Sequence, residues 1–345
     1  MNRGFWDNLP TPIIGISPMD GVTDAPFRLI AAKHGRPVVT ITEFTSVEGI
    51  CHGSVKALTA FKFDEIERPI VAQVYGIDVE SFYKSAFVVA ELGFDGIDIN
   101  MGCPAASVSS RGAGAGLIRT PDLAKEIIRA SKQAMKEWHE GKKIEDVGLP
   151  ENIVAWVKEH QPQKVERKLL PVSVKTRIGY DQITVDEWVK HLLEEEPVNI
   201  SIHGRTLKQM YTGSANWEAI GSAAKIIKQT KTTVMGNGDI HSLPDAMEKI
   251  KTYGVDGVLI GRAAFGNPWL LIDKLPTLEE KFAVAIEHAE VYEKILGAEY
   301  FVPMRKHLAW YIRGFSNASE LRQKLMQAKS SQDVKDILAA TKAIQ

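Results

Sequence analysis

The stretch Phe94-Asp-Gly-Ile-Asp-Ile-Asn-Met-Gly-Cys-Pro104 predicts the unit from which most of the chain is built. Its first half is a short apolar run between turn residues, which is typical of a buried strand. Downstream, Thr120-Pro-Asp122 combines a helix cap with a first-turn proline and so opens an amphipathic helix. Cys103 is therefore expected on a loop just past the carboxyl end of a strand, where α/β folds gather their reactive groups.

The same alternation of strand and helix continues on both sides of this unit. Eight β-rich runs are predicted at residues 13–17, 37–43, 69–75, 94–100, 170–176, 198–203, 232–236 and 255–260. Helices are predicted at residues 25–34, 79–92, 121–138, 185–196, 217–229 and 244–253. Eight units without a break in composition favour an α/β fold of the closed (β/α)8 TIM-barrel type over an open doubly wound sheet.

The strand pattern stops after Pro276, and residues 278–296, 302–315, 318–329 and 333–343 have the spacing of amphipathic helices. We therefore predict two domains, a barrel over residues 1–275 and a small all-α helical domain over residues 276–345. A polar segment at about residues 139–168 lies between a barrel helix and the next strand. Loops of that kind open on the bottom face of a barrel, so we interpret this segment as an elaboration outside the site.

The 345-residue chain has two cysteines, Cys51 and Cys103, which lie far apart in sequence. They form neither a C-x-x-C zinc motif nor a disulfide framework, so no metal site is expected and the thiols suit a reducing compartment. The first residues lack the apolar core of a signal peptide, and no run of about 18 apolar residues occurs. These features predict a cytoplasmic protein without a membrane anchor.

The formal net charge is −1, but the charge is unevenly distributed. Residues 301–345 carry eight Lys and Arg against three Asp and Glu, which leaves +5 there and −6 on the rest of the chain. A basic module on a mildly acidic body suggests a polyanionic partner, although a solvated helical face would account for the charge equally well.

Polar or conformationally special residues follow one predicted strand after another at its carboxyl end. They are Pro18, Met19 and Asp20 after the first run, Glu43 after the second, Gln73 in the third, Asn100 and Cys103 at the fourth, Lys175 and Arg177 at the fifth, His203 and Arg205 at the sixth, Asn237, Gly238 and Asp239 at the seventh, and Gly261 and Arg262 at the eighth. Any one of them has a structural alternative, such as an ion pair for Lys175 or a buried core position for His203. Because the strand ends of a barrel converge on one rim, their joint placement predicts a site there.

Two features of this rim indicate the chemistry of its ligand. The glycine-containing turns after the last two strands match the place where barrels bind phosphate through backbone N–H groups, and Arg262 adds a bidentate donor. Lys175 offers a positive charge where an anion must form on a bound ring. Together these features fit a phosphorylated, redox-active heterocycle such as flavin mononucleotide (FMN), although they fit a sugar phosphate as well.

Cys103 taken alone could be a structural thiol, since free cysteines are often buried as small apolar groups. Its neighbours favour a functional role, because Gly102 lets a ligand approach the backbone and Gly112, Gly114 and Gly116 supply a loop able to close. The spacing G-x-G-x-G differs from the dinucleotide fingerprint G-x-G-x-x-G, so we exclude a Rossmann-type site.

Six motifs together resemble those of the tRNA-dihydrouridine synthases over about residues 11–270. They are Ser17-Pro-Met-Asp-Gly-Val-Thr-Asp-Ala-Pro-Phe-Arg28, Asn100-Met-Gly-Cys-Pro104, Val174-Lys-Thr-Arg-Ile-Gly179, His203-Gly-Arg-Thr206 with Tyr211-Thr-Gly213, Asn237-Gly-Asp239 and Gly261-Arg262. The tail Arg305-Lys-His-Leu-Ala-Trp-Tyr311 also resembles the helical tRNA-binding domain of bacterial members. The polar segment and Asp20 depart from the usual pattern of the family.

The resemblance implies reduction of the C5–C6 double bond of specific uridines in tRNA, with FMN as cofactor and NADPH (or NADH) as reductant. Hydride would reach C6 from the flavin, and Cys103 would protonate C5 from the opposite face, since a thiol with a pKa of about 8.5 holds its proton at neutral pH. The cofactor residues implied are Pro18, Met19, Asp20, Gln73, Lys175, His203, Asn237, Gly238, Asp239, Gly261 and Arg262. The substrate residues implied are Asn100, Arg177, Arg205, Arg305 and Lys306. The target base must leave its stack, which costs about a few kcal/mol, and a basic helical domain that grips phosphates can offset that cost.

Two other functions fit the sequence. A flavin barrel could act on a free pyrimidine, as a dihydroorotate dehydrogenase does, although the basic tail and the lack of iron–sulfur cysteines weigh against it. A non-catalytic RNA-binding barrel is the second alternative, and it would be colourless when purified. In the favoured interpretation the partner is tRNA, with no membrane, no obligate protein partner and a monomeric chain.

Overall fold

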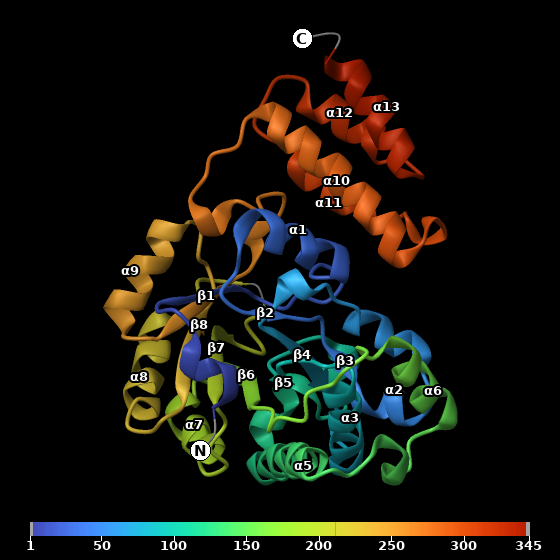
Figure 1. The fold of residues 1–345 in the computed structure, drawn as a ribbon. Helices are drawn as coiled ribbons and strands as arrows, with labels where there is room; N and C mark the ends of the chain where they lie inside the picture. Colours follow the sequence, from blue (N-terminus) through green and yellow to red (C-terminus); the bar gives the residue numbers. More distant parts are fainter. Residues whose placement is uncertain (1–2, 211, 343–345) are drawn as a thin grey trace.

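A parallel β-sheet curls into a barrel at the centre of the molecule (Figure 1). The computed structural model describes residues 3–210 and 212–342. The strands are β1 (Ile13–Ile16), β2 (Thr40–Ile41), β3 (Thr45–Ser46), β4 (Ile70–Tyr75), β5 (Gly96–Met101), β6 (Val172–Gly179), β7 (Asn199–Thr206), β8 (Thr233–Asn237) and β9 (Gly257–Ile260). Their order is β1-β9-β8-β7-β6-β5-β4-β2, with parallel pairing throughout, and β3 also pairs with β4. A bridge between Gly15 and Val39 brings β1 against the chain that enters β2. The barrel is thus nearly closed, and the predicted (β/α)8 architecture is confirmed.

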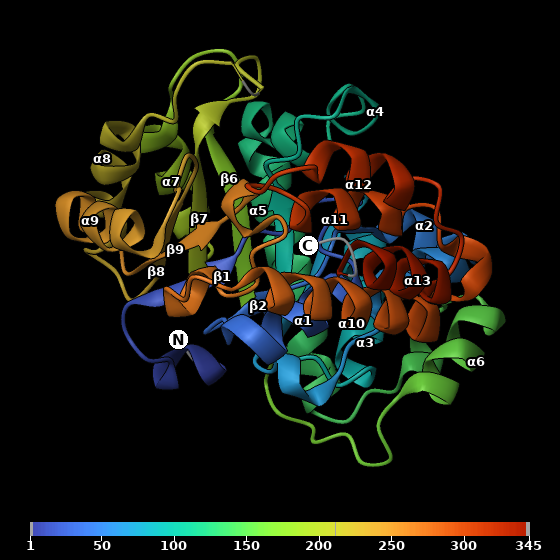
Figure 2. The ribbon, with the colours of Figure 1, turned by 90° about the horizontal axis from the view of Figure 1, so that it is seen from above.

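Helices between the strands cover the outside of this barrel, apart from the short α4, which belongs to the loop after β5 (Figure 2). They are α1 (Ala25–Gly35), α2 (Val47–Cys51), α3 (Val79–Glu91), α4 (Ala106–Ser109), α5 (Pro121–His139), α6 (Glu151–His160), α7 (Val185–Leu193), α8 (Trp217–Ile227) and α9 (Leu243–Tyr253). All six barrel helices predicted from the sequence are present. Each predicted segment carries an apolar stripe that can be buried against the sheet, which is why periodicity located it.

The second predicted strand, residues 37–43, differs most from expectation because it splits into β2 and β3. Thr42 N donates to Val71 O (3.0 Å), but Gln73 N donates to the Thr42 hydroxyl (3.0 Å) instead of a main-chain carbonyl. The side chain of Thr42 therefore interrupts the regular ladder beside β4, and pairing resumes at Thr45.

Apolar side chains fill the amino-terminal half of the barrel. Trp6, on a 3-10 turn at Gly4–Asn8, is buried in a cluster whose other members come from the strands and the residues that lead into them: Ile13, Val39, Ile41, Val71, Val198, Met235 and Leu259. This turn lies beside Pro171 and Gly96, at the amino ends of β6 and β5. The cluster closes that end of the barrel, so the carboxyl ends of the strands are the ones open to a ligand.

The polar segment at about residues 139–168 contains α6, which lies against α3 at the edge of the molecule (Figures 1 and 2). Asn152 Nδ2 donates to Gly53 O (2.8 Å), just beyond the end of α2, and Trp156 stacks on His160 with ring centroids 3.9 Å apart. The segment therefore packs on the outside of the barrel.

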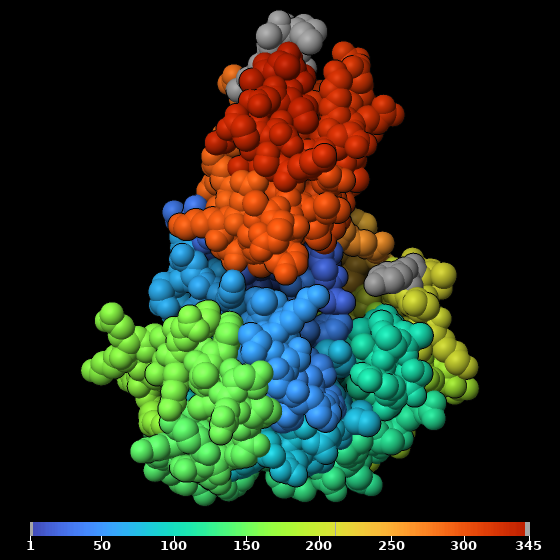
Figure 3. Space-filling view, turned by 90° about the vertical axis from the view of Figure 1, so that its right-hand side faces the viewer, coloured from blue at the N-terminus to red at the C-terminus, as the bar shows by residue number. Residues whose placement is uncertain are grey.

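Four helices follow the barrel and stand above it (Figures 1 and 3). They are α10 (Leu278–Leu296), α11 (Met304–Tyr311), α12 (Ala318–Leu325) and α13 (Ser331–Lys342). They share an apolar cluster that includes Phe282, Leu308 and Leu325 and extends to Ile30 and Trp269 of the barrel. Because this cluster crosses the boundary predicted at residues 275/276, the division into two domains remains a prediction.

Helix α11 is shorter than the predicted 302–315. Arg322 Nη1 donates to Ile312 O (2.8 Å) and so satisfies a carbonyl just past the helix end. Gly314 and Asn317 then take positive φ angles of 83° and 62°, which a right-handed helix does not allow.

The last predicted helix reached residue 343, which lies outside the described residues, and α13 ends at Lys342. Over residues 3–210 and 212–342, no helix combines the length and the apolar character needed to cross a membrane.

Candidate active site

The predicted polar side chains meet inside the carboxyl-terminal half of the barrel, as the strand register shows. Asn100 of β5 pairs with Lys175 of β6, Arg177 of β6 pairs with His203 of β7, and His203 pairs with Asn237 of β8. The Lys175 ammonium also reaches Asn237 Oδ1 (3.4 Å) across the intervening strand β7. That contact is available only to side chains that point into the barrel, so Lys175 and Asn237 face its interior.

A chain of buried side chains runs from β5 through β4 to the cysteine loop. Asp98 accepts hydrogen bonds from Ser173 Oγ (2.6 Å) and Gln73 Nε2 (2.7 Å). Gln73 Oε1 in turn accepts from Asn100 Nδ2 (2.9 Å), and Asn100 Oδ1 accepts from the backbone N–H of Cys103 (2.8 Å). Each amide is thereby held in one orientation, because flipping either one would break the chain at both ends. Both ends of the Asn100 amide, predicted to meet the substrate, are engaged by the protein itself.

Cys103 lies where the sequence predicted it, on the loop after β5, and is only 9% exposed. Its neighbours are Val108 and Ala113, with Phe44 and Tyr75 partly buried against them. Burial raises the pKa of the Cys103 thiol above its ordinary value, so the group carries its proton at neutral pH. The thiol is suited to donating a proton rather than to acting as a thiolate nucleophile.

Gly114 fixes the path of the loop that follows the cysteine. Its φ of 57° is left-handed, and a Cβ placed there would lie 2.8 Å from Cys103 O and 3.1 Å from Cys103 Cβ. Only glycine allows this close approach, so the loop returns directly over the thiol.

Lys175 and His203 give the interior a cation beside a neutral imidazole. Burial, followed by the charge of Arg177, lowers the pKa of Lys175 to about 8, so the side chain is still mostly charged at pH 7. Burial and the charges of Arg177 and Lys175 hold the pKa of His203 well below its ordinary value, which leaves the ring neutral. The expectation of a positive charge at Lys175 therefore holds at neutral pH, but that charge is lost more readily than in water.

Arg177, predicted to contact the substrate, connects two segments of the rim. Its Nε donates to Gly102 O (2.6 Å) and its Nη1 to Thr206 O (3.1 Å), and the side chain is buried. These bonds hold the cysteine loop against the end of β7. Sequence reasoning anticipated a charged residue here but not this supporting role.

Asp239 holds two arginines together at the ends of β7, β8 and β9. It accepts from Arg205 Nη2 (2.7 Å), Arg262 Nη2 (2.8 Å) and the backbone N–H of Ala215 (2.8 Å). Burial acts to raise the pKa of Asp239, but these contacts outweigh it and leave the pKa lowered. The side chain of Arg262 remains 59% exposed, so the ion pairs orient it without removing it from solvent.

Two stretches of backbone complete the rim beside this ion pair. Gly238 has a φ of 125°, and a Cβ there would lie 2.7 Å from the Cβ of Ala215, so the turn after β8 requires glycine. After β1, Pro18 and Met19 are half-buried and Asp20 is exposed, and Met19 N donates to Thr23 Oγ1 (2.9 Å). Gly261 faces this loop, since a Cβ on it would meet Met19 Sδ at 3.6 Å.

Glu43, which follows the second predicted strand, is a titratable group at the same rim. Burial and the nearby carboxylate of Asp24 raise the pKa of Glu43 to about 7, with Arg28 opposing them. The carboxyl group is therefore partly protonated at neutral pH.

Arg305 and Lys306 lie on α11, away from the barrel interior. Arg305 Nε donates to Ala328 O (2.8 Å) and so braces the C-terminal helices, whereas Lys306 Nζ donates to Gly21 O in the loop after β1. Lys306 also lines a groove of about 580 Å³. We call this the basic groove, and its lining residues are Lys306, Ala309, Trp310, Arg313, Arg322 and Met326.

Asp98 is the functional-site residue that sequence reasoning missed. It lies two residues before Asn100 in the same strand and therefore points to the same face, into the barrel. An acidic residue inside an otherwise apolar strand could have indicated a functional role for Asp98 from the sequence alone. Burial raises the pKa of Asp98 to about 6.

Known proteins resemble this chain over nearly its whole length. Residues 15–143 and 148–345 match the family model described as Dihydrouridine synthase (Dus). The chain is 36% identical over 348 positions to a "Probable tRNA-dihydrouridine synthase" of Staphylococcus aureus (strain MRSA252), which covers 98% of this chain and 95% of that protein. It is 35% identical to the "Probable tRNA-dihydrouridine synthase 2" of Bacillus subtilis (strain 168), and the match covers 98% of this chain and 96% of that protein. Among solved structures, the old yellow enzyme from Trypanosoma cruzi matches with a TM-score of 0.45 at 11% identity, over 80% of this chain and 93% of that one.

Proposed function

The chain belongs to the dihydrouridine synthase family, and from this premise we propose that it reduces the C5–C6 double bond of uridines in tRNA to 5,6-dihydrouridine. The reaction uses FMN and NADPH (or NADH), and Cys103 is the proton donor. Family membership weighs against both alternatives, the oxidoreductase of a free pyrimidine and the non-catalytic RNA-binding barrel.

The proton-donor role rests on one observation: the thiol of Cys103 is buried and its backbone is fixed by Asn100. Saturation of C5–C6 adds one hydride and one proton, and bound flavin supplies the hydride when it has been reduced. Cys103 Sγ supplies the proton, because its thiol is protonated at neutral pH and its backbone is held by Asn100. A fixed acid of this kind needs no general base to prepare it.

The barrel interior offers groups that fit FMN. Lys175 is a buried cation whose single hydrogen bond among the described residues is the 3.4 Å contact with Asn237, so it can still meet an anionic ring or carbonyl oxygen. Arg262 and the turns at Gly238 and Gly261 suit a phosphate. The residues we assign to the cofactor are Pro18, Met19, Asp20, Gln73, Lys175, His203, Asn237, Gly238, Asp239, Gly261 and Arg262.

We assign tRNA to the open side of the rim and to the C-terminal helices. Asn100, Arg177 and Arg205 line the site near the target base, although each of them also supports the protein backbone or a neighbouring ion pair. Arg305 and Lys306 lie on α11, and Lys306 lines the basic groove, whose cations can hold phosphates while the uridine leaves its stack. In this proposal residues 1–275 form the catalytic domain and residues 276–345 the tRNA-binding domain. A monomer in the cytoplasm, with both cysteines as free thiols, completes the proposal.

Nucleoside analysis by mass spectrometry tests this function directly. Unmodified tRNA transcript and tRNA isolated from cells are each incubated with the protein, FMN and NADPH. We expect at least one uridine to gain two hydrogens. A protein that binds flavin and oxidises NADPH but leaves every uridine of both tRNAs unchanged would contradict the proposal and favour a free pyrimidine as substrate.

A further inference from the structure

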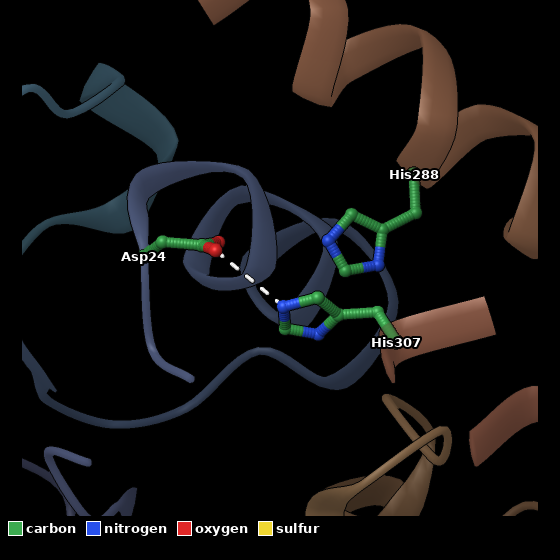
Figure 4. Close-up of side chains that lie close together, drawn as sticks. All are labelled: Asp24, His288 and His307. Carbon is green, nitrogen blue, oxygen red and sulfur yellow. Dashed lines mark ion pairs between the residues drawn. The ribbon is translucent and has the colours of Figure 1, made fainter. Parts of the chain in front are cut away.

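Three buried side chains that can ligate a metal ion face one another where the C-terminal helices meet the barrel (Figure 4). Asp24 caps the start of α1, His288 lies on α10 and His307 on α11. Their candidate ligand atoms lie within 4.8 Å of one another, and the two histidines are 0% and 1% exposed. Within the described part of the chain, this is the one group of three or more such side chains.

The hydrogen bonding of this cluster is incomplete. His288 Nδ1 lies 3.1 Å from the hydroxyl of Tyr311, but His288 Nε2 and both ring nitrogens of His307 have no hydrogen-bond partner among the described residues. His307 Nε2 is 3.4 Å from Asp24 Oδ2, an ion-pair distance without hydrogen-bond geometry. Figure 4 shows that both rings turn a nitrogen toward the Asp24 carboxylate. Buried nitrogens without partners are costly, and an ion bound between the two rings would satisfy His288 Nε2 and His307 Nε2 together.

We propose that Asp24, His288 and His307 bind a zinc-class divalent ion that fastens the C-terminal helices to the barrel. Two imidazoles and a carboxylate are ligands that zinc prefers, at about 2.0–2.2 Å, with water able to fill a fourth position. Two ligands of one tetrahedral ion stand about 3.4 Å apart at those bond lengths. His307 Nε2 and Asp24 Oδ2 already have that separation. No two ligand atoms of the cluster are more than 4.8 Å apart, so the rings need to draw in by at most about 1.4 Å on binding.

The surroundings of the cluster suit such an ion. The Tyr311 hydroxyl can accept a hydrogen bond from His288 Nδ1–H, and with the proton on Nδ1 the Nε2 atom has a free lone pair for the metal. Asp24 Oδ1 accepts from Phe27 N (2.9 Å), so the carboxylate is fixed in orientation. The rings of Phe27 and Trp310 pack on His307 at centroid distances of 5.8 and 4.9 Å and keep solvent away.

The position of this ion gives it a structural role beyond the proposed reaction. Asp24 directly follows the rim loop that contains Met19 and Asp20, and Lys306 Nζ of α11 donates to Gly21 O of the same loop. An ion at Asp24 would therefore hold α10 and α11 at a fixed place relative to the opening of the barrel. This inference does not depend on which reaction the barrel performs.

The test is a metal analysis of the full-length chain, produced without a polyhistidine tag and handled without chelators. The protein is incubated with a small excess of Zn²⁺, desalted and measured by mass spectrometry of its metal content. We expect about one zinc per chain for the wild type and at least a tenfold loss for His288→Ala and for His307→Ala. Co²⁺ in place of Zn²⁺ should give the visible absorption of a tetrahedral site in the wild type only.

The matched control is His34→Ala, which removes a histidine of the same junction that pairs with Glu287 (2.7 Å) and should keep its zinc. The double variant His288→Ala/His307→Ala serves as the metal-free reference. A chelator should lower the melting temperature of the wild type by several degrees and leave that of the double variant unchanged. A wild type with no more zinc than the double variant would overturn the proposal and leave a buried Asp24–His307 ion pair. Since that outcome depends on the wild type, poor folding of a variant cannot hide it.

Discussion

The rim of the barrel and the basic groove use polar side chains in opposite ways. At the rim, Gln73 and Asn100 have both ends of their amides bonded within the protein, and the thiol of Cys103 is held at the end of that chain. In the basic groove, Arg313 is exposed and Trp310 is only partly buried. A reacting group must be placed within a fraction of an ångström, whereas an RNA backbone is held by charge and tolerates freedom in the side chains. Variants of the rim should therefore lower the rate of the reaction, and variants of the basic groove should weaken tRNA binding.

Cys103→Ala should have the largest effect. We expect formation of dihydrouridine to fall by about 10²- to 10⁴-fold, the usual contribution of a positioned acid, while flavin binding and flavin reduction by NADPH remain. The two rates are measured separately, by nucleoside analysis and by flavin absorbance. Cys51→Ala is the control, because Cys51 lies on α2 with its Sγ 3.9 Å from Ser81 O and should change neither rate. Equal losses in both rates for Cys103→Ala would mean that the thiol is structural.

Asp98→Ala tests whether the rim depends on its buried chain of side chains. Removing the carboxylate leaves Gln73 Nε2 without its acceptor, which costs about 1–3 kcal/mol of stability, whereas Ser173 Oγ keeps its longer contact with Ile97 O (3.4 Å). In addition to this loss of stability, we expect kcat to fall by about tenfold with little change in KM for tRNA. The reason is that Asp98 acts through Gln73 and Asn100 and does not contact the substrate. Ser173→Ala, which removes one donor and leaves the chain to Cys103 intact, should lower stability alone. An unchanged kcat in Asp98→Ala would mean that the loop does not need this support.

Arg313→Ala tests the basic groove and should have a smaller effect. Loss of one phosphate contact should weaken tRNA binding by several-fold and flatten the dependence of log K on log salt by about 1, with kcat at saturating tRNA unchanged. The matched control is Lys324→Ala, which removes an equal charge from α12 at a residue already paired with Glu320 (2.9 Å). Equal effects of the two variants would show that only the net charge of the C-terminal helices matters.

The same contrast explains what could be predicted from the sequence. Strand ends and glycine turns are local features of the sequence, so they predict the eight-stranded pattern. They also predict that Lys175, His203 and Asn237 meet at one rim, and the structure confirms these positions. The roles assigned to these residues stay predictions. Charge counting also located the basic tail without any tertiary information.

Features that depend on register between distant strands could not be predicted in this way. Asp239 was expected to contact a cofactor, and nothing local indicates that it pairs with Arg205 of β7 and with Arg262, which follows β9. The Asp24, His288 and His307 cluster joins the start of the barrel to α10 and α11, and no spacing rule relates residues so far apart. The hydroxyl of Thr42 splits a strand only because Gln73 lies opposite it.

The pH dependence of the reaction should show the smallest effect and separates two groups of the rim. Cys103 must keep its proton and burial raises its pKa, so the thiol stays competent throughout the neutral range and fails only above the pH at which an ordinary thiol titrates. Lys175 must keep its charge, and its pKa is lowered to about 8, so its contribution is present below that pH and disappears as the pH rises through it. We therefore expect less than about a twofold change in rate between pH 6 and 7.5, followed by a decline that starts near pH 8 and is due to Lys175.

Lys175→Arg identifies the group behind that decline, because a guanidinium remains charged throughout this range. In a variant that retains flavin, the fall in rate should move to higher pH, where only loss of the Cys103 proton remains to limit the reaction. The measurement is single-turnover formation of dihydrouridine from pre-reduced protein across the pH range. If the decline stays near pH 8 in Lys175→Arg, the thiol has a lower pKa than its buried position indicates, and the rim holds its acid less rigidly than its hydrogen bonds suggest.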